Sequence, residues 1–282
     1  MKERNKIMKL EIRINNVNGF NNTVIEDDRK HYIYRSYKDR LFEILHDAKD
    51  DIPDIWWLQE IRPGVKEHQI LNELKLKAEM LGLTLVTTVD EADFEKHPKS
   101  LLNVLLIKDV NEFEVLKTQK EISLYRRINY IRVNFKSAPN RDFYILHIHA
   151  PQIDYFPGHS INDGYVRRRK YLEREFYRAL KYEVSQLVEQ KKNVIVLGDF
   201  NKSLQSDDLK DLMKSGLTVV SGGMERTYYG PGNNRSKSID HILMANNLAD
   251  DESFKLIRSV TDRNVVTNRL TDHATIKVGV NV

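Results

Sequence analysis

Cysteine is absent from the 282-residue sequence. Its absence excludes disulfide bonds, thiolate metal sites and cysteine nucleophiles. No feature of the composition therefore marks an oxidising compartment, and we expect a cytoplasmic protein.

Long apolar runs are also missing. No segment approaches the roughly 18 apolar residues of a membrane-spanning helix. The chain begins with the charged stretch MKERNKIMKLEIRINN, which lacks the apolar segment of a secretory signal. We therefore expect a soluble, unprocessed chain with no stable membrane association.

A large excess of one charge is missing as well. The 45 basic and 41 acidic residues nearly cancel, so the formal charge of +4 favours acidic partners only weakly unless the basic residues cluster. The sequence has no internal repeat, low-complexity tract or long linker. We expect one domain over residues 1–282, and a monomer.

Apolar periodicity divides the chain into helices and strands. Helical spacing of apolar residues predicts helices around residues 34–48, 70–81, 165–190 and 208–214. Runs rich in β-branched and aromatic residues predict strands around residues 10–16, 52–60, 83–89, 101–108, 128–135, 142–150, 193–199, 239–245 and 276–280. This pattern predicts an α+β fold with two mostly antiparallel sheets packed face to face and helices outside, a four-layer α/β/β/α sandwich.

Polar residues gather where these strands end. Five strands end in NNVNG, LQE, LHIHAP, LGDFN or SIDH, and TDH precedes the last one. Because strand ends of a sandwich lie at one of two edges, these side chains can meet in one place. They comprise Glu60, Asp199, Asp240, Asp272, Asn16, Asn18, Asn201, His147, His149, His241 and His273.

Oxygen donors dominate this set, which suits Mg²⁺ or Mn²⁺ better than Zn²⁺. Such an ion can neutralise phosphate charge while a second carboxylate or a histidine activates water. The strand-end residues therefore favour phosphate-ester hydrolysis.

The ordered motifs NNVNGF, WWLQE, HIHAP, GDFN, SIDH and TDH resemble those of the endonuclease/exonuclease/phosphatase superfamily, which includes DNase I and exonuclease III. The resemblance extends from Asn16 to His273. It implies the DNase I-like sandwich and a metal-dependent hydrolase of phosphodiesters, with DNA or RNA as the favoured substrate.

Residue roles follow from the resemblance alone. It implies that Glu60 binds the metal, with Asn16 and Asp272 beside it, and that Asn18 contributes to substrate binding. Some members have aspartate at the position of Asn18, which implies one fewer charged ligand here. The implied catalytic residues are His149, Asp199, Asn201, Asp240 and His273, and either Asp199 or the Asp240–His273 pair is the base.

Histidine at position 149 implies poor activity at abasic sites, because members specialised for these sites have tyrosine there. His147 is assigned to substrate binding, with a buried structural histidine as the equal alternative. His241 should point to the opposite face. Arg167, in the run RRRK, is also assigned to substrate binding, although such a run is more often a solvated helix face.

Alternatives remain open. Asp199 and Asn201 also suit a turn in which both side chains bond local backbone, and Glu60 could be a solvated strand end beside Arg62. Phospholipid or inositol phosphate hydrolases share these motifs, and a catalytically silent binding module is a further alternative.

Overall fold

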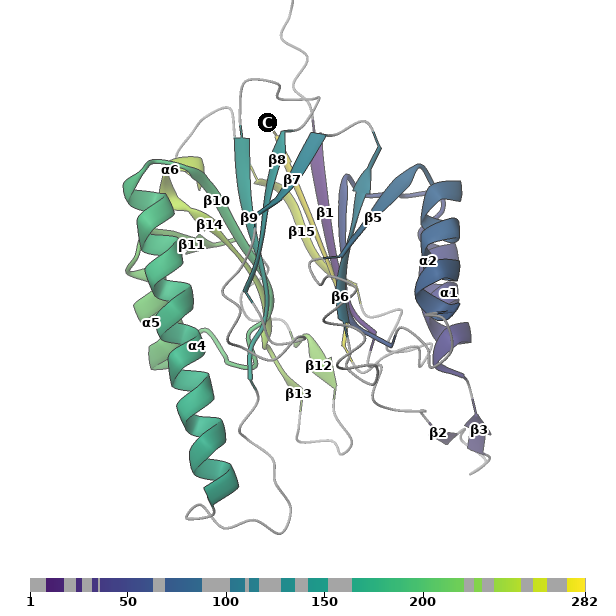
Figure 1. Ribbon diagram of the computed structural model, residues 1–282, viewed down its shortest axis with the longest axis horizontal. Coiled ribbons are helices and arrows are strands. Elements are labelled where there is room, and N and C mark those ends of the chain that lie inside the picture. The colour runs from purple at the N-terminus through teal and green to yellow at the C-terminus, as the bar shows by residue number, and fades with distance from the viewer. Residues whose placement is uncertain are drawn as a thin grey trace, which may run out of the picture.

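The computed structural model consists of two six-stranded sheets packed face to face (Figure 1). It describes residues 9–17, 24–26, 32–34, 36–62, 69–87, 102–109, 112–116, 128–134, 142–151, 164–220, 226–229, 236–249, 256–262 and 273–281. No helix in this part of the chain is long and apolar enough to span a membrane.

The first sheet has the strand order β15-β16-β1-β4-β6-β5. Only β1 and β4 run parallel within it, and the other neighbours are antiparallel. Its strands are β1 (Lys9–Asn16), β4 (Ile55–Ile61), β5 (Leu83–Thr87), β6 (Leu102–Lys108), β15 (Leu256–Asp262) and β16 (Thr275–Asn281).

The second sheet has the order β11-β14-β10-β9-β8-β7, with only β9 and β10 parallel. Its strands are β7 (Glu112–Leu116), β8 (Ile128–Asn134), β9 (Asp142–His149), β10 (Asn193–Asp199), β11 (Leu217–Val219) and β14 (Asp240–Ala245). Because β9 and β10 are parallel neighbours, they end at the same edge of this sheet.

Helices cover the outer faces (Figure 1). Helices α1 (Tyr37–Asp47) and α2 (Gln69–Met80) lie on the first sheet, and α4 (Gly164–Glu189) and α5 (Asp207–Met213) lie on the second. The short α6 (Asn246–Ala249) follows β14 and packs Leu248 into the core between the sheets. Two short hairpins complete the described elements: β2 (Val24–Glu26) with β3 (Tyr32–Tyr34), and β12 (Tyr228–Tyr229) with β13 (Ser236–Lys237).

Three apolar cores separate the four layers. The central core lies between the sheets and includes Ile12, Ile14 and Leu197. A second core joins α1 and α2 to the first sheet through Trp56, and a third joins α4 to the second sheet through Phe176. The predicted sandwich of two mostly antiparallel sheets with outer helices is thus confirmed.

Local structure differs from the sequence prediction at several places, and strands β2, β3, β7, β11 and β15 were not predicted. The first helix was expected from about residue 34, but Tyr34 lies in β3 and Ser36 caps α1 by accepting a hydrogen bond from the Asp39 N–H at 3.1 Å. No element was predicted in the segment 221–237, yet it contains the hairpin β12–β13. Strands this short form because neighbouring strands pair with them, so local sequence carries little signal for them.

Candidate active site

Strand pairing brings three of the predicted catalytic residues into one row. At the end of β10, Asp199 lies opposite His149 of β9 on one side and opposite Asp240 of β14 on the other. All three side chains are at most 3% exposed. The row lies at the edge where β9 and β10 end and β14 begins.

Gly198 allows β10 to lie close to β9 and to Gln59 of the first sheet beside this row. Its φ is +136°, and an added Cβ would lie 2.0 Å from the Ile148 carbonyl oxygen. The same oxygen accepts a hydrogen bond of 2.9 Å from the Gln59 side chain of β4. A larger residue at position 198 would therefore displace the contact between β9 and the first sheet.

Glu60 reaches the row from the first sheet. The β4–β6 pairing is irregular between Leu58 and Ile61, and Glu60 within this bulge has a φ of 58°. A carboxylate oxygen of Glu60 lies 3.5 Å from Nε2 of His149, which is also 3.8 Å from Oδ2 of Asp199. Left-handed backbone at a non-glycine residue is strained, and such strain gathers at functional sites.

Asn201 forms a turn with Asp199. Its backbone N–H donates to Oδ1 of Asp199 at 2.7 Å, its side-chain Nδ2 donates to the Ala150 carbonyl at 2.9 Å, and its φ is 51°. One carboxylate oxygen of Asp199 thus takes part in the turn that was the alternative interpretation of GDFN. The other oxygen faces His149.

Thr227 holds the Asp240–His273 pair, a role that no sequence pattern indicated. Nδ1 of His273 lies 2.9 Å from Oδ2 of Asp240. The Thr227 hydroxyl accepts hydrogen bonds of 3.0 Å from the backbone N–H groups of Ile239 and Asp240, and its carbonyl accepts one of 2.7 Å from Ala274. One buried threonine thus fixes the backbone on both sides of the pair.

Acidic side chains crowd together at the centre of the site. Burial raises the pKa of the Asp199 carboxyl well above its usual value and the Asp240 carboxylate adds to this, whereas His273 and the Asn201 N–H act in the opposite direction. Ligand atoms of Asp199, Asp240 and His273 all lie within 4.8 Å of one another. Crowded carboxylates with no thiolate suit a hard divalent cation, so the residues present fit one.

His147 lies apart from the surface groups of the site. Its side chain is 0% exposed and its ring stacks on Trp57 of β4, with centroids 3.2 Å apart and planes 16° apart. Neither ring nitrogen has a hydrogen-bond partner within the described ranges. Burial, and secondarily His149, lowers its pKa well below the usual value. The structure thus places His147 in the core beneath His149.

The other predicted site residues are placed as follows. Asn16 is buried at the end of β1, where it pairs with Gln59 of β4. Arg167 is exposed in the first turn of α4. Asn18 and Asp272 lie outside the described residues. His241 points away from the row, and its Nε2 lies 2.9 Å from the Lys202 carbonyl oxygen.

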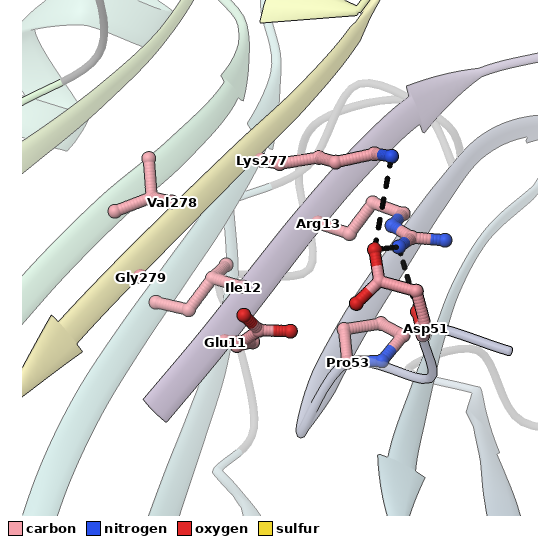
Figure 2. A pocket seen from close by; sticks show the side chains of 8 residues that line it. All are labelled: Glu11, Ile12, Arg13, Asp51, Pro53, Lys277, Val278 and Gly279. Carbon is pink, nitrogen blue, oxygen red and sulfur yellow. Dashed lines mark hydrogen bonds and ion pairs between the residues drawn. The ribbon is translucent and has the colours of Figure 1, made fainter. Parts of the chain in front are cut away.

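A separate pocket lies near the opposite ends of β1 and β4 (Figure 2). There the Arg13 guanidinium donates to the backbone oxygen of Asp51 at 2.7 Å and to its carboxylate at 2.8 Å. Lys277 lies 3.8 Å from the same carboxylate, and Glu11 also lines the pocket. Two cations and two carboxylates balance there, so the pocket offers no excess charge for an ionic ligand.

The sequence profile of the Endonuclease/Exonuclease/phosphatase family matches residues 16–273. The chain belongs to this family. No curated protein matches the chain in sequence. The endonuclease/exonuclease/phosphatase profile spans the same residues that the strand-end motifs delimit, from Asn16 to His273.

Solved structures share the fold of this family member at low sequence identity. D. rerio TDP2, complexed with single-strand DNA product, is 14% identical with a TM-score of 0.61, and the match covers 97% of this chain and 99% of that one. The 3′ phosphatase NExo from Neisseria, bound to a product DNA hairpin, is 16% identical with a TM-score of 0.62 and coverage of 95% and 98%. An endonuclease/exonuclease/phosphatase from Bacteroides vulgatus is 14% identical with a TM-score of 0.63 and coverage of 98% and 99%.

Proposed function

We propose that the protein is a metal-dependent phosphoesterase that hydrolyses phosphodiester bonds of nucleic acid, in the manner of a DNase I-like nuclease. The arrangement that carries this proposal is the buried Asp199, with the Asp240–His273 pair on one side and the His149–Glu60 contact on the other. It brings together residues that can serve as base, as phosphate ligand and as metal ligand.

The cation belongs beside Glu60, with Asn16 and Asp272 as further ligands, and Mg²⁺ or Mn²⁺ fits these oxygen donors. When bound, such an ion supplies charge neutralisation to the phosphate and its leaving oxygen. The carboxylates of Asp199 and Asp240 close by raise the negative charge that favours cation binding.

We assign proton transfer to Asp199 or to His273. The Oδ2 atom of Asp199 is not used by the turn with Asn201, so it can accept a proton from an attacking water. Alternatively Nε2 of His273 accepts the proton while Asp240, bonded at Nδ1, holds the ring and stabilises its cationic form. His149 and Asn201 then hydrogen-bond the phosphate oxygens as negative charge develops on them.

Nucleic acid is supported as the substrate by two structural neighbours of the same fold. The TDP2 structure contains single-strand DNA product and the NExo structure a product DNA hairpin. Fold similarity at this identity leaves phospholipid and inositol phosphate as the competing substrates.

A substrate panel tests the proposal directly. The purified protein is incubated with DNA, RNA, sphingomyelin and inositol phosphates, with Mg²⁺ or with excess chelator. We expect metal-dependent cleavage of DNA or RNA. Faster turnover of a lipid or inositol phosphate would make the protein a phospholipid or inositol phosphate hydrolase. No turnover of any substrate with any metal would favour a catalytically silent binding module.

A further inference from the structure

The start of α4 carries a dense group of unbalanced cations. Residues 164–174 contain five basic side chains and one acidic one, a surplus of four that equals the formal charge of +4 for the whole chain. Arg167, Arg168 and Lys170 are exposed, and none of them forms an ion pair with a residue that the structure describes. The start of α4 is therefore a densely basic stretch of the chain.

Cations further along α4 and after β10 are compensated. Arg178 pairs with Glu175, and Lys181 lies 2.8 Å from Asp211 of α5. Lys202 lies 3.1 Å from Glu173, the single acidic residue of the basic segment. Arg174 at the end of the segment lies 4.0 Å from Glu175, so the exposed cations that lack an ion pair among the described residues are Arg167, Arg168 and Lys170.

Topology puts this segment at the edge of the active site. Helix α4 connects β9 to the parallel strand β10, so it runs antiparallel to both and begins at the edge where His149 and Asp199 lie. The ion pair between Glu173 of α4 and Lys202 shows which part of the helix lies beside the active-site edge, because Lys202 directly follows Asn201. Arg167 precedes Glu173 by six residues and so lies about 9 Å further along the axis, at ~1.5 Å per residue.

Figure 1 shows the start of α4 extending below the ends of the strands of the second sheet. Tyr171 in this segment is 54% exposed, and the Arg174 guanidinium lies 5.7 Å from the centroid of its ring. Cations around an exposed aromatic ring suit nucleic acid, because the cations neutralise phosphates and bases stack on the ring.

We propose that residues 167–174 form a binding surface for the phosphate backbone of a nucleic-acid strand, outside the catalytic site. A distance of about 9 Å along the axis of a duplex corresponds to roughly three phosphates of one strand, at ~3.4 Å of axis each. This binding surface rests on the proposed function, because the active site sets the position of the cleaved bond. The segment holds the strand beyond that bond and makes affinity depend on strand length and salt.

The test measures binding separately from cleavage. Fluorescence anisotropy follows a labelled single-stranded DNA of about 20 nucleotides in excess chelator, between about 50 and 200 mM salt. The variant Arg167→Gln/Arg168→Gln/Lys170→Gln removes three exposed cations from the segment. The control Lys49→Gln/Lys75→Gln/Lys191→Gln removes three exposed lysines elsewhere, so both variants have the same net charge.

We expect the segment variant to bind at least about tenfold more weakly at low salt, with the slope of log affinity against log salt reduced by about 2, since each phosphate contact on a single strand contributes ~0.7. The control should bind like the parent. Equal losses in both variants would overturn the inference, as would a parent that binds anionic phospholipid vesicles but no oligonucleotide. A parent that binds DNA through this segment but cleaves no phosphodiester would contradict the proposed function alone.

Discussion

Nδ1 of His273 lies 2.9 Å from Oδ2 of Asp240, although 33 positions separate the two residues in the chain. Asp240 belongs to the second sheet, and His273 directly precedes the part of the chain that enters the first. The pair therefore depends on correct docking of the two sheets, and it joins the fold to the proposed chemistry.

The variant Asp240→Asn tests what this pair contributes. The amide keeps the size of the side chain but cannot stabilise a cationic His273, so turnover should fall by about 10²- to 10⁴-fold if the pair is the base. The measurement is the rate of phosphodiester cleavage against pH. A parental rate and pH profile would remove the pair from the mechanism and leave Asp199 as the base.

Thr227 should matter for stability as well as for activity. Thr227→Val keeps the shape but leaves two buried N–H groups, those of Ile239 and Asp240, without their acceptor. We expect the free energy of unfolding to fall by about 1–3 kcal/mol, with reduced turnover. Thr227→Ser, which keeps the hydroxyl, is the matched control. If valine and serine variants unfold alike in urea, the two hydrogen bonds contribute nothing measurable.

The sequence predicted the elements of the site better than their connections. Strand-end motifs identified Glu60, His149, Asp199, Asp240 and His273 because polar residues after apolar runs are visible locally. The contacts of Thr227 and Gln59 were not visible, since a threonine in a polar segment or a glutamine at a strand end has no local pattern for a tertiary hydrogen bond. The bulge that turns Glu60 toward His149 likewise depends on pairing with β6.

His147 should make the protein sensitive to acid. Its pKa is lowered well below its ordinary value of 6.5, mainly by burial, so below about pH 6.5 the unfolded chain binds a proton that the folded protein does not. Its contribution to stability is therefore fully present above pH 6.5 and is lost as pH falls below it.

The variant His147→Phe keeps an aromatic ring against Trp57 and removes the titration. In urea unfolding from about pH 7.5 to 5, the variant should gain stability relative to the parent as pH falls. Other titrating groups contribute equally to the stability of both proteins, so their contributions cancel in the difference. A stability difference that stays constant with pH would show that burial of His147 has no such cost.

Glu60→Gln should weaken activity chiefly through metal affinity. The amide retains the size of the side chain but loses the negative charge that a hard cation requires, so half-maximal activity should need more Mg²⁺. The measurement is cleavage rate against metal concentration, with the exposed Glu79→Gln as control. Full activity of the parent in excess chelator would contradict the metal proposal itself.

The two histidines of β9 should differ in cleavage. His149 lies 3.5 Å from Glu60 at the active site, whereas His147 is enclosed against Trp57. We expect His149→Ala to reduce cleavage more than His147→Ala, and the parent to cut an abasic duplex no faster than an intact one. Selective incision at abasic sites, or a larger loss in His147→Ala, would contradict the role given to His149.

Turnover of Asp199→Asn, measured together with its thermal unfolding, tests the central proposal most directly. The amide oxygen can still accept the Asn201 N–H bond that forms the turn, and loss of a buried charge beside Asp240 relieves repulsion, so the variant should unfold at or above the parental temperature. We predict that cleavage of the best phosphodiester falls by about 10²- to 10⁴-fold. Near-parental turnover in a variant of parental stability would contradict the role of Asp199 at the centre of the proposed site and leave it as a turn residue.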